Sequence, residues 1–215
     1  MNVDEIIKSD IRSSLTKSGL LLFLAGFTIF MSIITSEIFF KKTYTTRDNY
    51  ISELGAPMTP EGVISKPSAE IFNYSMIVSG LMILLATFFL HKIYKKLITT
   101  IPVGLFGAGI LGVGIFPGNI APWHMICAIT LFIAGGVGAI TSYKITSAPI
   151  RYLFICLGIV TLVFLFGYKY FIPSLGAGGA ERWVFYPVLF WLTGLGGYLL
   201  GIKDEYRHMS HVKPE

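Results

Sequence analysis

The feature of this sequence that most constrains its fold is a series of six long apolar segments. Each is close to the length of about 20 residues that a helix needs to cross a membrane. The composition agrees, because the chain is 53% hydrophobic and only 13% charged, against about 25% charged residues in soluble domains. The sequence therefore predicts an all-α, multi-pass protein of the cell membrane, with six transmembrane helices in one bundle.

The apolar segments also predict the domain organisation. A charged lead-in at 1–17, cytoplasmic or lying in the membrane interface, precedes a transmembrane domain at 18–202, and a cytoplasmic tail follows at 203–215. The domain contains one long polar loop, at 41–70. The first apolar segment is interpreted as a retained helix, because it lacks the small-residue end of a cleavable signal. The predicted helices are 18–40, 70–90, 97–116, 123–143, 149–171 and 181–202.

An even number of helices places both termini on one side of the membrane. The terminal segments and the connections on their side carry 11 lysines and arginines, against six for the opposite side. The positive-inside rule then predicts that both termini are cytoplasmic. The loop at 41–70, the hairpin at 117–122 and the glycine-rich turn at 173–180 would all emerge on the outer side, where their polar residues can converge.

Several function classes are disfavoured by the same residues. The net charge of +5 comes from basic residues at the ends of apolar segments, so it indicates membrane orientation and no nucleic-acid partner. Cys127 and Cys156 lack metal-ligand spacing, and His124 is the one histidine near the outer face, so no metal site and no cofactor are predicted. The G-x-G-x-x-G match at 107–112 lies inside an apolar helix and predicts close helix packing.

The candidate site consists of the polar residues expected to meet at the outer end. His124 and Glu53 carry the groups most suited to proton transfer, and the other members are candidate ligand-binding residues. Two members also have structural interpretations: Asn73 can tether the 41–70 loop, and His124 can bond to a neighbouring loop. The full set is Asn49, Ser52, Glu53, Asn73, Ser75, His124, Glu181 and Arg182.

Charge pairing within this set is expected to follow from helix electrostatics. Arg182 opens a helix, where the macrodipole disfavours a cation, so it should have an anionic partner, either Glu53 or a lipid phosphate. Glu37 is expected to pair with Lys41, four residues later. Ser52, Glu53 and His124 are the residue types of a Ser–His–acid triad, but no nucleophile elbow accompanies them, so a true triad is not expected.

The order of these motifs along the chain resembles the DUF998 family of prokaryotic integral membrane proteins. The resemblance implies a six-helix bundle of unknown activity, and it extends more distantly to the eukaryotic Frag1/DRAM group, which includes proteins tied to lipid-anchor remodelling. That likeness concerns the fold and transfers no function. Asn119 stands where many relatives have an aspartate, so no carboxylate role is implied there. The motifs are Asn49–Gly55, Phe72-Asn73 with Gly80, Gly112–Pro117, His124 and Glu181-Arg182.

Three functions fit the sequence. The leading hypothesis is a membrane protein whose outer-face polar pocket binds or modifies a membrane lipid or similar amphiphile. The second is a small-molecule transporter, although the apolar helices hold few of the ionisable groups that coupled transport uses. The third is a non-catalytic structural or regulatory subunit, in which the polar cluster only holds the loop in place. The sequence indicates no oligomeric state.

Overall fold

The computed structural model describes residues 3–40, 43–56 and 66–209, which form helices joined by turns and loops. Five helices are long and apolar enough to cross a membrane, and α5, with 17 residues, is the shorter apolar sixth. The predicted all-α membrane bundle with six helices is therefore confirmed. The elements are α1 (Val3–Ile38), η1 (Ile51–Leu54), α2 (Lys66–Tyr94), α3 (Leu97–Ile115), α4 (Trp123–Thr141), η2 (Ser142–Lys144), α5 (Ile150–Phe166) and α6 (Tyr168–Met209).

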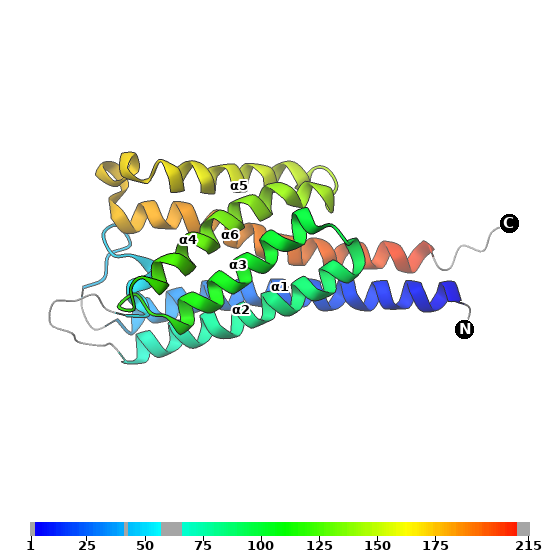
Figure 1. The fold of residues 1–215 in the computed structure, drawn as a ribbon, viewed down its shortest axis with the longest axis horizontal. Coiled ribbons are helices and arrows are strands. Elements are labelled where there is room, and N and C mark those ends of the chain that lie inside the picture. The colour runs from blue at the N-terminus through cyan, green and yellow to red at the C-terminus, as the bar shows by residue number, and fades with distance from the viewer. Residues whose placement is uncertain (1–2, 41–42, 57–65, 210–215) are drawn as a thin grey trace.

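The helices pack in chain order, and α6 returns to contact α1, so that the bundle closes on itself (Figure 1). Trp191 of α6 is fully buried; its ring meets Phe106 edge-on, and its Nε1–H donates to Ser142 Oγ at 2.9 Å. Many large apolar side chains remain exposed, Phe88 and Phe166 among them. Such broad apolar exposure is expected of a surface that faces lipid.

Small residues set the distances between neighbouring helices. A Cβ on Gly107 would lie 2.8 Å from Ile83 of α2, and one on Gly109 would lie 2.6 Å from Leu131 of α4. These glycines therefore allow α3 to approach two neighbours closely. The prediction that the G-x-G-x-x-G match serves helix packing is confirmed.

The N-terminal lead-in differs from the expectation of a separate segment. α1 begins at Val3 and continues without a break to Ile38. Asp10 forms an exposed ion pair with Lys92 of α2, with 3.3 Å between Oδ2 and Nζ. The charged lead-in thus forms the first turns of α1, and Asp10 joins it to the last turns of α2.

The junction of α5 and α6 also differs from the predicted boundaries. α5 ends at Phe166 instead of 171, and α6 begins at Tyr168, so most of the predicted turn at 173–180 is helical. The helical geometry is interrupted at Gly176, whose φ of 76° is a conformation that glycine adopts readily. α6 therefore consists of a short segment, 168–175, and a long one that starts at 177.

The two ends of the bundle have different structures (Figure 1). The start of α1 and the end of α6 lie at one end, together with the connections at 95–96 and 142–149. The connections at 43–56 and 116–122 and the start of α6 lie at the other, which we call the loop end. The predicted convergence of these three connections is thus observed, and the side of the membrane that each end faces stays a prediction.

Candidate functional site

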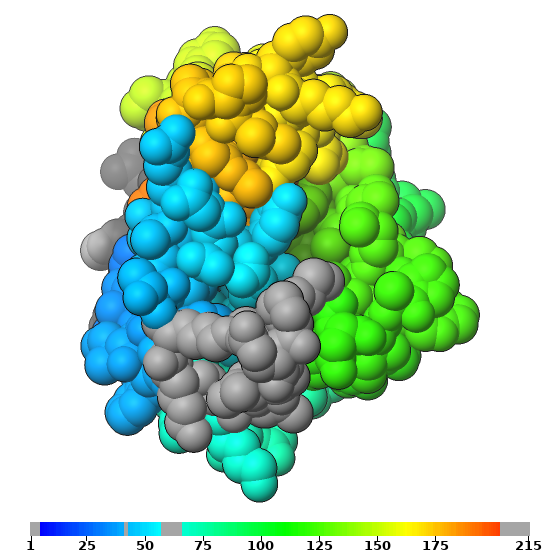
Figure 2. All heavy atoms as spheres, turned by 90° about the vertical axis from the view of Figure 1, so that its left-hand side faces the viewer, coloured from blue at the N-terminus to red at the C-terminus, as the bar shows by residue number. Residues whose placement is uncertain are grey.

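The loop end is closed by residues 43–56, which we call the cap loop; it lies between the start of α6 and the other helices (Figure 2). Its backbone rests directly on the glycine-rich part of α6. The N–H of Gly179 donates to the Arg47 carbonyl at 3.0 Å. A Cβ on Gly178 would lie 2.1 Å from the Asn49 carbonyl oxygen, so a side chain there is incompatible with this contact. The glycines of the predicted turn therefore form the surface on which the cap loop sits.

The Arg182 guanidinium holds the cap loop on α6. Its Nη1 donates to three backbone carbonyls at 2.9 to 3.0 Å, and its Nη2 donates to Glu37 Oε1 at 2.9 Å and to the Tyr44 hydroxyl at 2.7 Å. Arg182 is only 8% exposed, so this charge is buried and paired. The three carbonyls belong to Thr46, Asn49 and Gly178.

Tyr44 supports the same network as a neutral hydroxyl. Burial raises the pKa of the Tyr44 phenol, against the opposing influence of the Arg182 charge. The neutral phenol accepts from Arg182 and donates to the Tyr50 carbonyl at 3.1 Å. Tyr44 therefore links the guanidinium to the centre of the cap loop.

Glu53 shapes the cap loop from within. Its Oε1 accepts from the N–H of Tyr50 at 2.9 Å, and its Oε2 accepts from Asn49 Nδ2 at 2.8 Å. The first of these bonds caps the short helix η1. The expectation that Glu53 is the internal partner of Arg182 is therefore wrong. Glu53 binds groups of its own loop, and Glu37 is the carboxylate that pairs with Arg182.

Two side chains of α2 attach the C-terminal end of the cap loop to that helix. Ser68 Oγ donates to the Leu54 carbonyl at 3.1 Å, and Asn73 Nδ2 donates to the Gly55 carbonyl at 2.9 Å. A Cβ on Gly55 would lie 2.3 Å from Asn73 Oδ1, so glycine is needed for this approach. The interpretation of Asn73 as a tether for the loop is thus confirmed.

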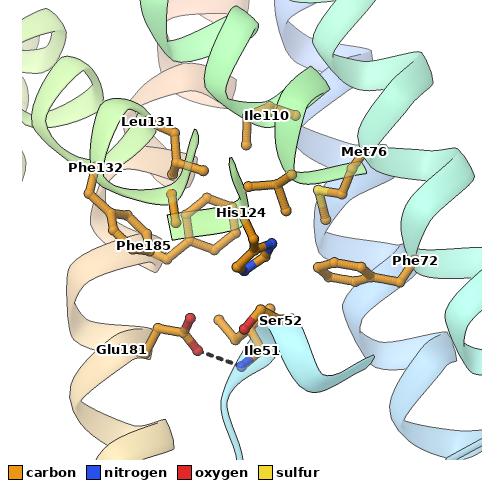
Figure 3. Close-up of a pocket in the computed structure, with 12 residues that line it drawn as sticks. Ile51, Ser52, Phe72, Met76, Ile110, His124, Leu131, Phe132, Glu181 and Phe185 are labelled. Atoms are coloured by element: carbon orange, nitrogen blue, oxygen red, sulfur yellow. Dashed lines mark hydrogen bonds between the residues drawn. The ribbon is translucent and has the colours of Figure 1, made fainter. Parts of the chain in front are cut away.

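A small cavity lies beneath the cap loop, in the interior of the loop end (Figure 3). Its volume of about 30 Å³ is room for a water-sized or hydroxyl-sized group. Most of the lining is apolar, and the polar exceptions are Ser52, His124 and Glu181, which come from η1, α4 and α6. The lining residues are Ile51, Ser52, Phe72, Met76, Ile110, Val113, His124, Ala128, Leu131, Phe132, Glu181 and Phe185.

The imidazole of His124 extends into the space above Ser52, with Glu181 at its side (Figure 3). Its Nδ1 lies 2.8 Å from the Phe116 carbonyl oxygen. Since a carbonyl can only accept, Nδ1 must carry the hydrogen. In neutral His124 the Nε2 atom is then an acceptor, and it has no partner in the part of the chain that the structure describes.

Glu181 joins the cavity to the cap loop. Its Oε2 accepts a hydrogen bond from the N–H of Ile51, the first residue of η1. Figure 3 shows this contact at the lower edge of the cavity, on the side opposite Phe72. The carboxylate that shares the cavity with His124 is therefore Glu181, and Glu53 is not among the lining residues.

The predicted site residues thus divide into two groups. Ser52, His124 and Glu181 line the cavity, whereas four others shape the cap loop or attach it to the helices. Ser75 is partly buried on α2 and is not among the residues that line the cavity. The four residues of the second group are Asn49, Glu53, Asn73 and Arg182.

The sequence reasoning missed two of the partners of Arg182. The i, i+4 spacing predicts Lys41, which lies outside the described residues, as the partner of Glu37, and no local pattern indicates Tyr44 as a partner of Arg182. The one signal for Glu37 is a carboxylate at the end of an apolar helix, a position where an arginine partner is favourable. Among the described residues, no three His, Cys, Asp or Glu side chains are grouped as metal ligands.

Comparison with known proteins gives one match. The family model described as "Protein of unknown function (DUF998)" matches residues 24–198, which include every residue of the cavity and of the Arg182 network. No curated protein and no solved structure matches the chain significantly.

Proposed function

This chain belongs to the DUF998 family of proteins of unknown function, and we propose that it is a multi-pass protein of the cell membrane that binds the polar end of an amphiphile beneath its cap loop. The observation that carries this proposal is the cavity at the loop end, in which Ser52, His124 and Glu181 meet among apolar side chains. Ligand sites commonly have this form, with a few placed polar groups in an apolar concavity.

The position of the cavity suits an amphiphile. It lies at one end of a bundle whose outer surface is apolar, so a ligand could keep its chain in the membrane while its polar end enters the protein. The cavity is only partly enclosed. Because its volume is about 30 Å³, it would admit one small polar group, and the remainder of the ligand would lie outside it.

Preorganisation of the cavity also supports binding. Phe116 holds the His124 ring in one tautomer, and Ile51 orients the Glu181 carboxylate. Groups that are held in place before a ligand arrives lose little conformational entropy when it binds. In this proposal the Arg182 network serves the site by holding the cap loop closed over it.

The proposal is tested by photocrosslinking in lipid nanodiscs with three amphiphiles that share one diazirine-bearing chain and end in a hydroxyl, an amine or a phosphate. We expect saturable labelling by at least one probe, on peptides that contain Ser52 or His124. Ala128→Phe should abolish it, because Ala128 lines the cavity and the larger ring would fill the space.

The matched control is Ala108→Phe, which makes the same change at an exposed position of α3. Labelling should then equal that of the parent protein. If no probe labels the parent saturably, or if Ala128→Phe labels like the parent while remaining folded by size-exclusion chromatography, the site is wrong. A structural subunit or a transporter would then be the better hypothesis, and a flux assay in liposomes would separate those two.

A further inference from the structure

The donors and acceptors in the cavity restrict which head group could bind there. In its ionised form Glu181 can only accept hydrogen bonds. Nε2 of neutral His124 is also an acceptor, because Nδ1–H is used by Phe116. Ser52 can donate or accept. The cavity therefore offers two acceptors to which a donor of the ligand could bind.

The charge around the cavity disfavours an anionic head group. None of the twelve lining residues is a lysine or an arginine, and one of them is an acid. An anion held here would be partly desolvated beside Glu181, and like charges in such a place repel strongly.

Arg182, the nearest cation along the chain, is already occupied. Its two terminal nitrogens have five protein acceptors, three carbonyls, the Glu37 carboxylate and the Tyr44 hydroxyl. These acceptors use all four terminal N–H groups of the guanidinium. A phosphate could bind these N–H groups only by displacing one of the five acceptors, so the expected contact between Arg182 and a lipid phosphate is disfavoured.

The size of the cavity favours a small, uncharged head group. A volume of about 30 Å³ admits a hydroxyl but is small for a phosphate with its four oxygens. An ammonium group would bring three donors and a hydration shell to a lining that is mostly apolar. Its desolvation would be costly with one carboxylate as the counter-charge.

From these four observations we infer that the ligand is a hydroxyl-headed amphiphile, an alcohol whose O–H donates to Glu181 or to His124 Nε2. This inference rests on the proposed function and narrows its ligand class. Ser52 would donate to the oxygen of the same hydroxyl, so that donor and acceptor capacities are both satisfied. The apolar lining, Phe72 and Phe185 included, would surround the hydroxyl group, and the carbon chain would continue outside the cavity.

The test is a competition experiment in nanodiscs at neutral pH, in which a panel of unlabelled amphiphiles displaces the probe that labels the parent protein best. The panel consists of dodecanol, dodecyl methyl ether, dodecylamine and dodecyl phosphate, which differ only in the head group. The ether keeps the oxygen and removes the donor. Loss of one hydrogen bond should weaken the ether roughly two- to tenfold relative to the alcohol.

Two variants test which side chain of the cavity distinguishes the alcohol from the ether. Glu181→Gln keeps an oxygen that can accept from Ile51 and removes the charge, so the preference for alcohol over ether should fall several-fold. His124→Phe keeps an aromatic ring and removes Nε2, so the preference for alcohol over ether should fall in this variant too. Glu70→Gln makes the same acid-to-amide change at an exposed position of α2 outside the cavity, and it should keep the preference of the parent.

The outcomes separate the inference from the function on which it rests. An ether, amine or phosphate that competes as well as the alcohol overturns the alcohol inference and leaves the binding function standing. A preference for the alcohol that survives in both Glu181→Gln and His124→Phe also overturns it. The absence of any saturable labelling in the parent protein overturns the binding function itself.

Discussion

Arg182, which is buried, forms an ion pair with the partly exposed Glu37, with 2.9 Å between Nη2 and Oε1. The pair joins the start of the long segment of α6 to the last turn of α1. The same guanidinium binds three carbonyls of the cap loop and of α6. One side chain thus couples the closure of the helical bundle to the closure of the loop above it.

Replacing Arg182 by methionine should destabilise the folded protein strongly. The variant would leave the partly exposed Glu37 and the three carbonyls without this donor, and removing the donor of a charged or buried acceptor costs about 1–3 kcal/mol. The free energy of unfolding, measured by denaturant titration in detergent, should fall by that amount. Lys169→Met is the control, because it removes an exposed cation of α6 near the same end. It should change the free energy of unfolding by less than about 0.5 kcal/mol. Equal effects of the two variants would contradict the role of Arg182.

Adding a methyl group at Gly178 should release the cap loop. The Cβ of an alanine would lie 2.1 Å from the Asn49 carbonyl oxygen, so the loop would have to move away from α6. Amide hydrogen exchange of the cap loop should become faster in Gly178→Ala, while exchange in the middle of α3 should stay slow.

Gly197→Ala is the matched control for that experiment, because it makes the same change in the same helix. Its Cβ would meet nothing within 4 Å. Alanine is the better helix former by roughly 0.5–1 kcal/mol, so Gly197→Ala should leave the cap loop protected and raise the melting temperature slightly. Unchanged exchange in Gly178→Ala would show that the loop does not depend on this contact.

Removing the side chain of Asn73 should loosen the other attachment of the cap loop. Asn73→Ala leaves the Gly55 carbonyl without its donor, and an unsatisfied buried carbonyl costs about 1–3 kcal/mol. Ser75→Ala, two residues further along α2, should have a smaller effect on thermal unfolding, since the Ser75 hydroxyl makes no side-chain hydrogen bond within the described residues. A larger loss of stability in Ser75→Ala would reverse this assignment.

The predicted orientation can be measured by cysteine labelling in intact cells. After Cys127 and Cys156 are replaced by serine, Lys169→Cys reports on the loop end and Lys95→Cys on the end that carries the termini. With cytoplasmic termini, a membrane-impermeant maleimide should label Lys169→Cys directly and Lys95→Cys only after permeabilisation. The reverse pattern would show that the loop end faces the cytoplasm.

The apolar segments were sufficient to predict the class of the protein, the number of helices and the convergence of three connections at one end. Those features depend on local hydrophobicity and helix length, which can be read along the chain. The boundaries near Gly176 could not be predicted in the same way. A glycine-rich stretch is compatible with a turn or with a helix that another backbone approaches closely, and only the position of the cap loop distinguishes them.

What only the tertiary structure decided is which polar groups meet. The pair of Arg182 with Glu37 spans 145 residues, and the contact of Glu181 with Ile51 spans 130. No local pattern encodes such pairings, because they follow from the return of α6 to α1. The sequence determined that polar residues would gather at one end of a membrane bundle. The fold decided that Arg182 holds the cap loop closed and that Ser52, His124 and Glu181 face the cavity beneath it.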